Sequence, residues 1–216
     1  MTPLEDLPGV RSVIGVDAGT VSLREADHLV HRLGDELGLP PGTVACTHLI
    51  RGGERPGTAV SFAFADSGPA EAAWRRLVRP DGREAGAAVG DRAYGAVLGD
   101  REHGPAAAVR AAALAAGEHA GRDAGRAVIY PGVEHLTGTV TLAELLALTA
   151  IDEVGVVGRQ PTGDQGPDPA TPVLTRGHVR PEWRGGRLRL ALVPAAGDSL
   201  APFEVPNPTP CCADHA

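Results

Sequence analysis

The chain of 216 residues contains no lysine, because all 20 of its Lys and Arg positions hold arginine. This absence excludes the lysine of a Walker-A phosphate loop, Schiff-base chemistry on a lysine amine and a lysine general base. Arginine stays protonated, so it binds anions but does not act as an ordinary proton shuttle. Enzyme classes that depend on lysine chemistry are therefore excluded.

Aromatic residues and basic charge are also scarce. Aromatic residues make up 3% of the chain, and 27 acidic residues against 20 basic ones give a net charge of -7 at pH 7. Phosphate backbones repel such a protein on average, and few rings are available for base stacking, so we expect no nucleic-acid partner. No apolar run approaches the roughly 20 residues of a membrane helix, and the first ten residues do not resemble a signal peptide. We therefore expect a soluble, cytoplasmic protein with no membrane partner.

Hydrophobic spacing predicts the order strand, helix, strand, strand, helix for the first 80 residues. The predicted strands cover 13–16, 43–50 and 58–64, and the predicted helices cover 23–38 and about 67–78. A capping box from Ser22 to Glu25 starts the first helix, because the serine and glutamate side chains satisfy free backbone amides there. This order is the opening of a ferredoxin-like βαββαβ unit.

The rest of the chain predicts two more helices among short strands. The helices are an alanine-rich one from 105 to about 121 and a second from the capping box Thr141–Glu144 to 148; the strands cover 92–98, 127–130, 154–157, 173–179, 187–193 and 200–205. The small side chains of the alanine-rich helix permit close packing against a sheet or a partner helix. The segment 127–157 predicts a parallel crossover, and the last two strands predict an antiparallel hairpin.

The predicted fold class is α/β, as a single domain over 1–216 with a mixed β-sheet flanked by helices, a C-terminal β-hairpin and an extended tail at 206–216. A Gly-Thr-Val sequence leading into a capping box occurs at Gly19 and again at Gly138. This echo suggests possible halves at 11–104 and 105–205, produced either by duplication or by chance convergence of two strand-to-helix junctions.

These two junctions are candidate ligand sites, because ligands gather at the carboxyl ends of strands and helix starts offer backbone amides to anions. The candidate ligand-binding residues there are Thr20, Ser22, Thr137 and Thr139. Helix capping alone also explains the pattern. We expect the two junctions to share one hollow that takes a small-molecule ligand.

An enzymatic role would use His135 as general acid/base, with Glu134 or Asp17 as its catalytic partner, since imidazole titrates near neutrality. A hydrogen-bonded loop histidine is the alternative. Arg180 and Trp183 form another candidate ligand-binding pair for a small anion. Alternatively, Trp183 anchors the C-terminal hairpin to the core.

The three cysteines divide into Cys46, predicted to be a small core residue, and a pair in the tail. Cys211, Cys212 and His215 form a candidate metal site for a zinc or copper ion. A vicinal disulfide, a redox-active thiol and an inert tail are the alternatives. Together these features predict a small-molecule or metal-binding or interaction protein, as a homo-oligomer; the alternatives are a small-molecule enzyme and a structural subunit.

Overall fold

The computed structural model describes residues 12–51, 56–78, 93–158 and 167–206. Contacts divide the chain into two compact units, Met1–Pro131 and Gly132–Ala216. The strands pair both in parallel and antiparallel fashion and helices accompany them, which confirms the predicted α/β class with a mixed sheet. The division between units falls after 131 and not after 104, because the alanine-rich helix packs on strands of the first unit.

The first unit holds six strands and three of the described helices. They are β1 (Ser12–Thr20), α1 (Leu23–Leu37), β2 (Val44–Ile50), β3 (Gly57–Phe64), α2 (Ser67–Leu77), β4 (Gly95–Leu98), β5 (Arg101–His103), α4 (Ala106–Gly121) and β6 (Arg126–Ile129). The strand order in the sheet is β5-β4-β1-β3-β2-β6. The central β4-β1-β3-β2 arrangement is antiparallel and carries the predicted βαββαβ chain order. The short edge strand β5 was not predicted.

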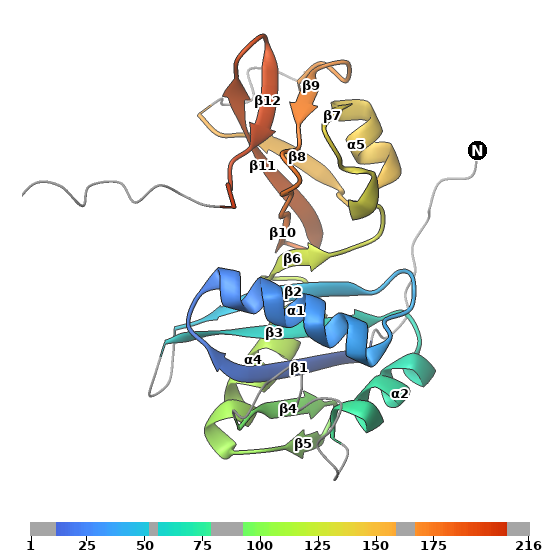
Figure 1. Ribbon diagram of the computed structural model, residues 1–216, viewed down its shortest axis with the longest axis vertical. Helices are drawn as coiled ribbons and strands as arrows, with labels where there is room; N and C mark the ends of the chain where they lie inside the picture. Colours follow the sequence, from blue (N-terminus) through green and yellow to red (C-terminus); the bar gives the residue numbers. More distant parts are fainter. Residues whose placement is uncertain (1–11, 52–55, 79–92, 159–166, 207–216) are drawn as a thin grey trace, which may run out of the picture. The chain divides into compact units, whose positions relative to one another are not determined.

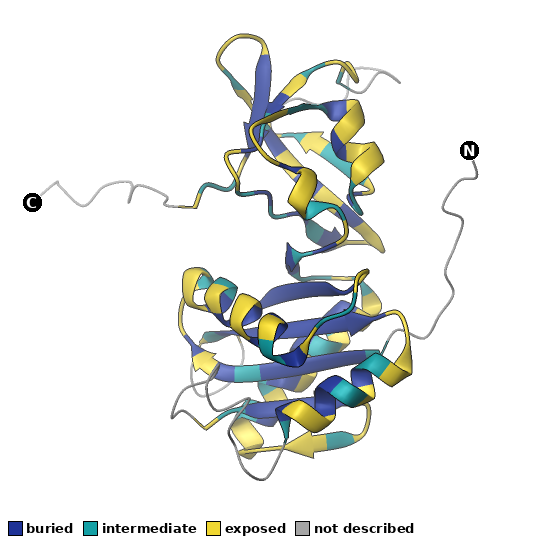
Figure 2. Ribbon diagram, turned by 45° about the vertical axis from the view of Figure 1, so that its right-hand side comes forward, coloured by how far each residue is buried: buried dark blue, intermediate teal, exposed yellow. Residues whose placement is uncertain are grey.

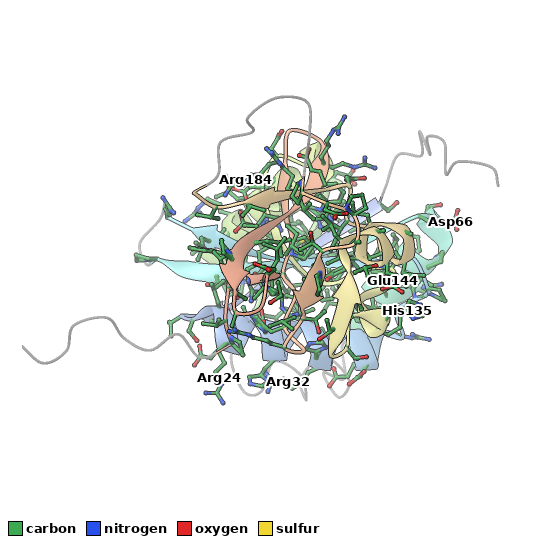
Figure 3. The ribbon with its side chains drawn as sticks, turned by 90° about the horizontal axis from the view of Figure 1, so that it is seen from above. Arg24, Arg32, Asp66, His135, Glu144 and Arg184 are labelled. Atoms are coloured by element: carbon green, nitrogen blue, oxygen red, sulfur yellow. The ribbon has the colours of Figure 1, made fainter. Side chains whose placement is uncertain are left out.

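Alternation along the strands gives this sheet two covered faces. Ile14, Val16, Phe62 and Phe64 belong to a core with Leu29, Leu33, Trp74 and Leu77 of α1 and α2. The alternate strand residues point to the other face, where Ala59 and Val97 pack with residues of α4. Helix α4 lies behind the sheet in the view of Figure 1. Strands between helices are buried on both faces, as Figure 2 shows. The outer face of α1 is exposed, with Arg24 and Arg32 pointing away from the ribbon (Figure 3).

The alanine-rich helix α4 packs on its own sheet at close range. A Cβ atom added to Gly15 of β1 would lie 2.0 Å from the carbonyl oxygen of Ala112, and one added to Gly95 of β4 would lie 2.3 Å from the carbonyl carbon of Ala108. Glycine in the strands and alanine in the helix therefore allow backbone to approach backbone. The sequence left two packing partners for this helix, a sheet or a partner helix. In the structure, α4 packs on the sheet.

The second unit combines short strands with one described α-helix. It contains the 3-10 turn η1 (Val133–His135), β7 (Thr139–Thr141), α5 (Leu142–Leu148), β8 (Glu153–Val156), β9 (Pro172–Leu174), β10 (Glu182–Arg184), β11 (Arg187–Ala195) and β12 (Ser199–Pro202). β11 and β12 form the predicted antiparallel hairpin. The two strands of the predicted parallel crossover do not pair with each other: β8 pairs in parallel with β11, and β6 pairs with β2. The strand predicted at 173–179 ends at Leu174, and β10 and β7 were not predicted.

A helix starts at each predicted capping box; the second box is complete, whereas in the first the Glu25 carboxylate accepts from the backbone amide of Val21 at 3.0 Å. The Ser22 hydroxyl accepts a hydrogen bond from the backbone amide of Glu25 at 3.2 Å, and Thr141 accepts one from Glu144 at 3.2 Å. The Glu144 carboxylate accepts a hydrogen bond from the backbone amide of Thr141 at 2.8 Å, which holds the pKa of this exposed carboxyl below its usual range. No helix among the described residues is long and apolar enough to cross a membrane.

Candidate metal centre

A group of polar side chains lies on the sheet face that α4 covers. In β2, Cys46 and His48 are two residues apart and therefore share one face of the strand. Ser61 of β3 is the register partner of Cys46, so it lies beside both of them on the same face. Glu118 and His119 come from the last turn of α4. Three elements thus bring five polar residues together between sheet and helix.

These side chains form one continuous chain of contacts. Nδ1 of His48 lies 2.8 Å from a carboxylate oxygen of Glu118, and Nε2 of His48 lies 2.7 Å from Oγ of Ser61. The same Oγ lies 2.7 Å from Nδ1 of His119, whose Nε2 is 3.9 Å from Sγ of Cys46. Every ring nitrogen of the two histidines therefore has a polar neighbour, as buried polar groups require.

The group is buried, apart from its carboxylate. Cys46 and Ser61 have no exposed surface and the two histidines have 2% each, whereas the side chain of Glu118 is 38% exposed. Water is thus excluded from the thiol and the imidazoles, while the carboxylate reaches the surface. In such a setting a cation is bound by protein atoms with little competition from solvent.

The three ligating side chains of this group suit a transition metal. One donor atom from each of Cys46, His48 and His119 can be chosen so that all lie within 4.8 Å of one another. Thiolate and imidazole are the ligands of zinc, and the combination of one cysteine and two histidines also occurs in copper sites.

The candidate residues of the first predicted junction lie elsewhere in the same unit. Asp17 is half-buried in β1, and its pKa is raised above 3.8 because burial disfavours the carboxylate more than the Gly19 amide stabilises it. Thr20 is buried at the end of β1 and donates a hydrogen bond of 2.5 Å to the carbonyl of Thr58. The Gly19–Thr20 sequence continues strand β1 and does not form a separate turn. Ser22 is the N-cap of α1.

The second predicted junction belongs to the second unit. Glu134 and His135 lie in η1 with exposed side chains, and Nε2 of His135 is 3.6 Å from a carboxylate oxygen of Glu134; Figure 3 labels His135. Thr137 and Thr139 are exposed, the latter at the start of β7. Asp17, the other proposed catalytic partner of His135, belongs to the first unit.

The remaining candidates divide between the second unit and the tail. Trp183 is buried in β10 and pairs with Leu188 of β11, a position that suits the anchoring role. Arg180 is half-buried and donates to the carbonyl of Val179 at 3.2 Å. Cys211, Cys212 and His215 lie outside the described residues.

Sequence reasoning missed the centre, although it identified Cys46 as buried. The available signal was the Cys-Thr-His alternation from Cys46 to His48, which places a thiol and an imidazole on one strand face. A second signal was the Glu118–His119 pair in an otherwise alanine-rich helix. Neither signal indicates that the two segments meet.

Comparison with protein-family models, curated proteins and solved structures found no match for this chain. The centre is therefore interpreted from its own geometry and chemistry.

Proposed function

We propose that this protein binds one transition-metal ion of the zinc and copper class through Cys46, His48 and His119. The observation that carries the proposal is the buried placement of these three donors within 4.8 Å of one another. Gathering buried thiol and imidazole groups costs free energy, because each group must be desolvated and then given a partner. A shared ion would satisfy all three at once.

The ligand types narrow the choice of ion. A soft thiolate with two imidazoles favours zinc, cobalt or copper over magnesium and calcium, which take oxygen ligands. The metal class is the one expected for the tail cysteines, but the proposed site is a different one. Its donors come from β2 and α4, so binding would also tie the helix to the sheet.

The test uses the full chain purified without an affinity tag. Metal content is measured by mass spectrometry, and cobalt(II) is then titrated into chelator-treated protein while thiolate-to-metal absorption is recorded. We expect one equivalent to bind with a cysteine signature, and zinc to displace it. Zinc in 100-fold excess over its Kd would stabilise the fold by about 2.7 kcal/mol.

Two sets of variants locate the ion. Cys46→Ser and His119→Gln keep the approximate side-chain size and should abolish the cobalt signature, with circular dichroism used to confirm that each variant folds. The matched control replaces the tail donors together, as Cys211→Ser, Cys212→Ser and His215→Ala, and should bind cobalt as the wild type does. The proposal is overturned if the wild-type chain binds neither ion, or if only the tail variant loses the signature. In that case the buried group is a hydrogen-bonded part of the core.

A small-molecule ligand, a homo-oligomeric assembly and the enzymatic alternative with His135 remain predictions from the sequence. His135 is 55% exposed in its side chain and Glu134 is 69% exposed. Replacement of His135 by Gln should leave metal binding at the proposed centre unchanged, because His135 is not one of its three donors.

A further inference from the structure

We infer that Glu118 and Ser61 are positioning residues of this centre, which select Nε2 of both histidines as the metal-binding atoms. The inference rests on the proposed function and names the atoms by which the ion would be held. It follows from the order of donors and acceptors in the hydrogen-bond series Glu118–His48–Ser61–His119. The donor in each hydrogen bond determines the donor in the next.

Glu118 determines the tautomer of His48. A carboxylate only accepts hydrogen bonds, so the 2.8 Å contact requires that Nδ1 of His48 carries the proton and donates it. In the neutral ring Nε2 of His48 is then the unprotonated nitrogen, which can accept a hydrogen bond or bind an ion. This arrangement of carboxylate, imidazole and metal recurs in metalloproteins, where the second partner fixes the ring and raises its basicity.

Ser61 determines the tautomer of His119 in the same way. Because Nε2 of His48 must accept, the Ser61 hydroxyl donates to it across 2.7 Å. The hydroxyl has one proton, so its oxygen accepts from Nδ1–H of His119, also at 2.7 Å. The lone pair of His119 is then on Nε2, the atom that faces Sγ of Cys46 at 3.9 Å.

The resulting ligand set is Nε2 of His48, Nε2 of His119 and Sγ of Cys46. Both Nδ1 atoms are held by second partners, one at the partly exposed carboxylate and one at the buried hydroxyl. An ion that binds His48 must displace the hydroxyl hydrogen from Nε2. Ser61 would then keep its bond to His119, so the same residue holds one ligand while releasing the other.

The test is nitrogen-15 NMR of the histidine rings in full-length protein, first chelator-treated and then loaded with zinc. We expect both rings as Nδ1–H tautomers before loading and coordination through Nε2 after it. In Glu118→Ala, His48 should show mixed tautomers, and zinc affinity should fall about 10- to 100-fold. Glu118→Gln retains an accepting oxygen and should restore the wild-type tautomer, a rescue that a purely structural role would not require.

Two further variants complete the test. In Ser61→Ala, His119 should show mixed tautomers. His48 should remain the Nδ1–H tautomer, since Glu118 still accepts a hydrogen bond from its Nδ1. Glu102→Ala, at an exposed position of the edge strand β5, is the matched control and should bind zinc as the wild type does. If zinc binds but either ring coordinates through Nδ1, or if Glu118→Ala leaves tautomer and affinity unchanged, this inference is wrong and the proposed function stands. If no zinc binds at all, both are wrong.

Discussion

Gly125 lies directly against the imidazole of His48. A Cβ atom at Gly125 would be 2.7 Å from Cε1 of His48 and 3.2 Å from Cβ of Cys46. The backbone there has φ +121°, a conformation that side chains disfavour. At Gly125 the connection between α4 and β6 therefore lies against the candidate centre without a side chain.

Gly125→Ala should destabilise the first unit by about 1–3 kcal/mol, because the added methyl group must displace the His48 ring and the backbone is strained. Metal affinity should fall in the same variant, since His48 moves. Urea denaturation followed by Trp74 fluorescence in a Trp183→Phe background reports on the first unit. Gly99→Ala is the control, because Gly99 has positive φ but open space around it, and its cost should be about 1 kcal/mol.

Gly15→Ala should destabilise more strongly than most single substitutions, because its Cβ would meet the main chain of α4 and not a movable side-chain tip. We expect a loss of at least about 3 kcal/mol in the same denaturation experiment. Gly117→Ala, within α4 itself, is the opposite case. Its Cβ would meet no atom within 4 Å, so the substitution should stabilise the helix by about 0.5–1 kcal/mol. Equal effects at the two positions would contradict this account of the α4 packing.

Asp27 of α1 and Arg126 of β6 form a bidentate ion pair on the other face of the sheet, at 2.6 and 3.1 Å. Both side chains are largely buried, at 15% and 8% exposure. Asp27→Asn should cost about 3 kcal/mol, because it removes the negative charge from a largely buried, charge-assisted bidentate pair. Glu71→Gln removes the carboxylate of an exposed pair with Arg101 and should cost less than about 1 kcal/mol. Thermal unfolding compares the two, and a larger effect at Glu71 would refute the prediction.

Burial raises the pKa of Asp17, which gives a stability change with a definite sign. A carboxyl whose pKa is higher in the folded chain binds its proton more tightly there, so stability falls as pH rises from 3.8 through the folded pKa. Asp17→Asn should therefore raise the melting temperature at neutral pH, while its amide oxygen keeps the bond from Gly19. The gain should disappear when both proteins are compared below pH 3.8. A melting temperature that falls at neutral pH would show that the carboxylate is stabilised by a partner.

Much of the first unit follows from local patterns in the sequence. The helix at Leu23–Leu37 begins where Ser22 and Glu25 predict it, because capping depends on residues within one turn. The hairpin strands β2 and β3 follow from β-branched and aromatic runs. Short strands such as β5 and β10 were missed, since three residues carry too little periodicity to be recognised.

The sequence by itself determined the longer helices and strands of the first unit and the burial of Cys46, because spacing and capping act over a few neighbouring residues. Only the tertiary structure decided the site. Ser61 and His119 are 58 residues apart in the sequence, and Cys46 and His119 are 73 residues apart. The register of the strands and the packing of α4 on the sheet bring them into contact. The packing of α4 depends on the close approach of its backbone to the strands at Gly15 and Gly95, a long-range steric fit that no local pattern encodes.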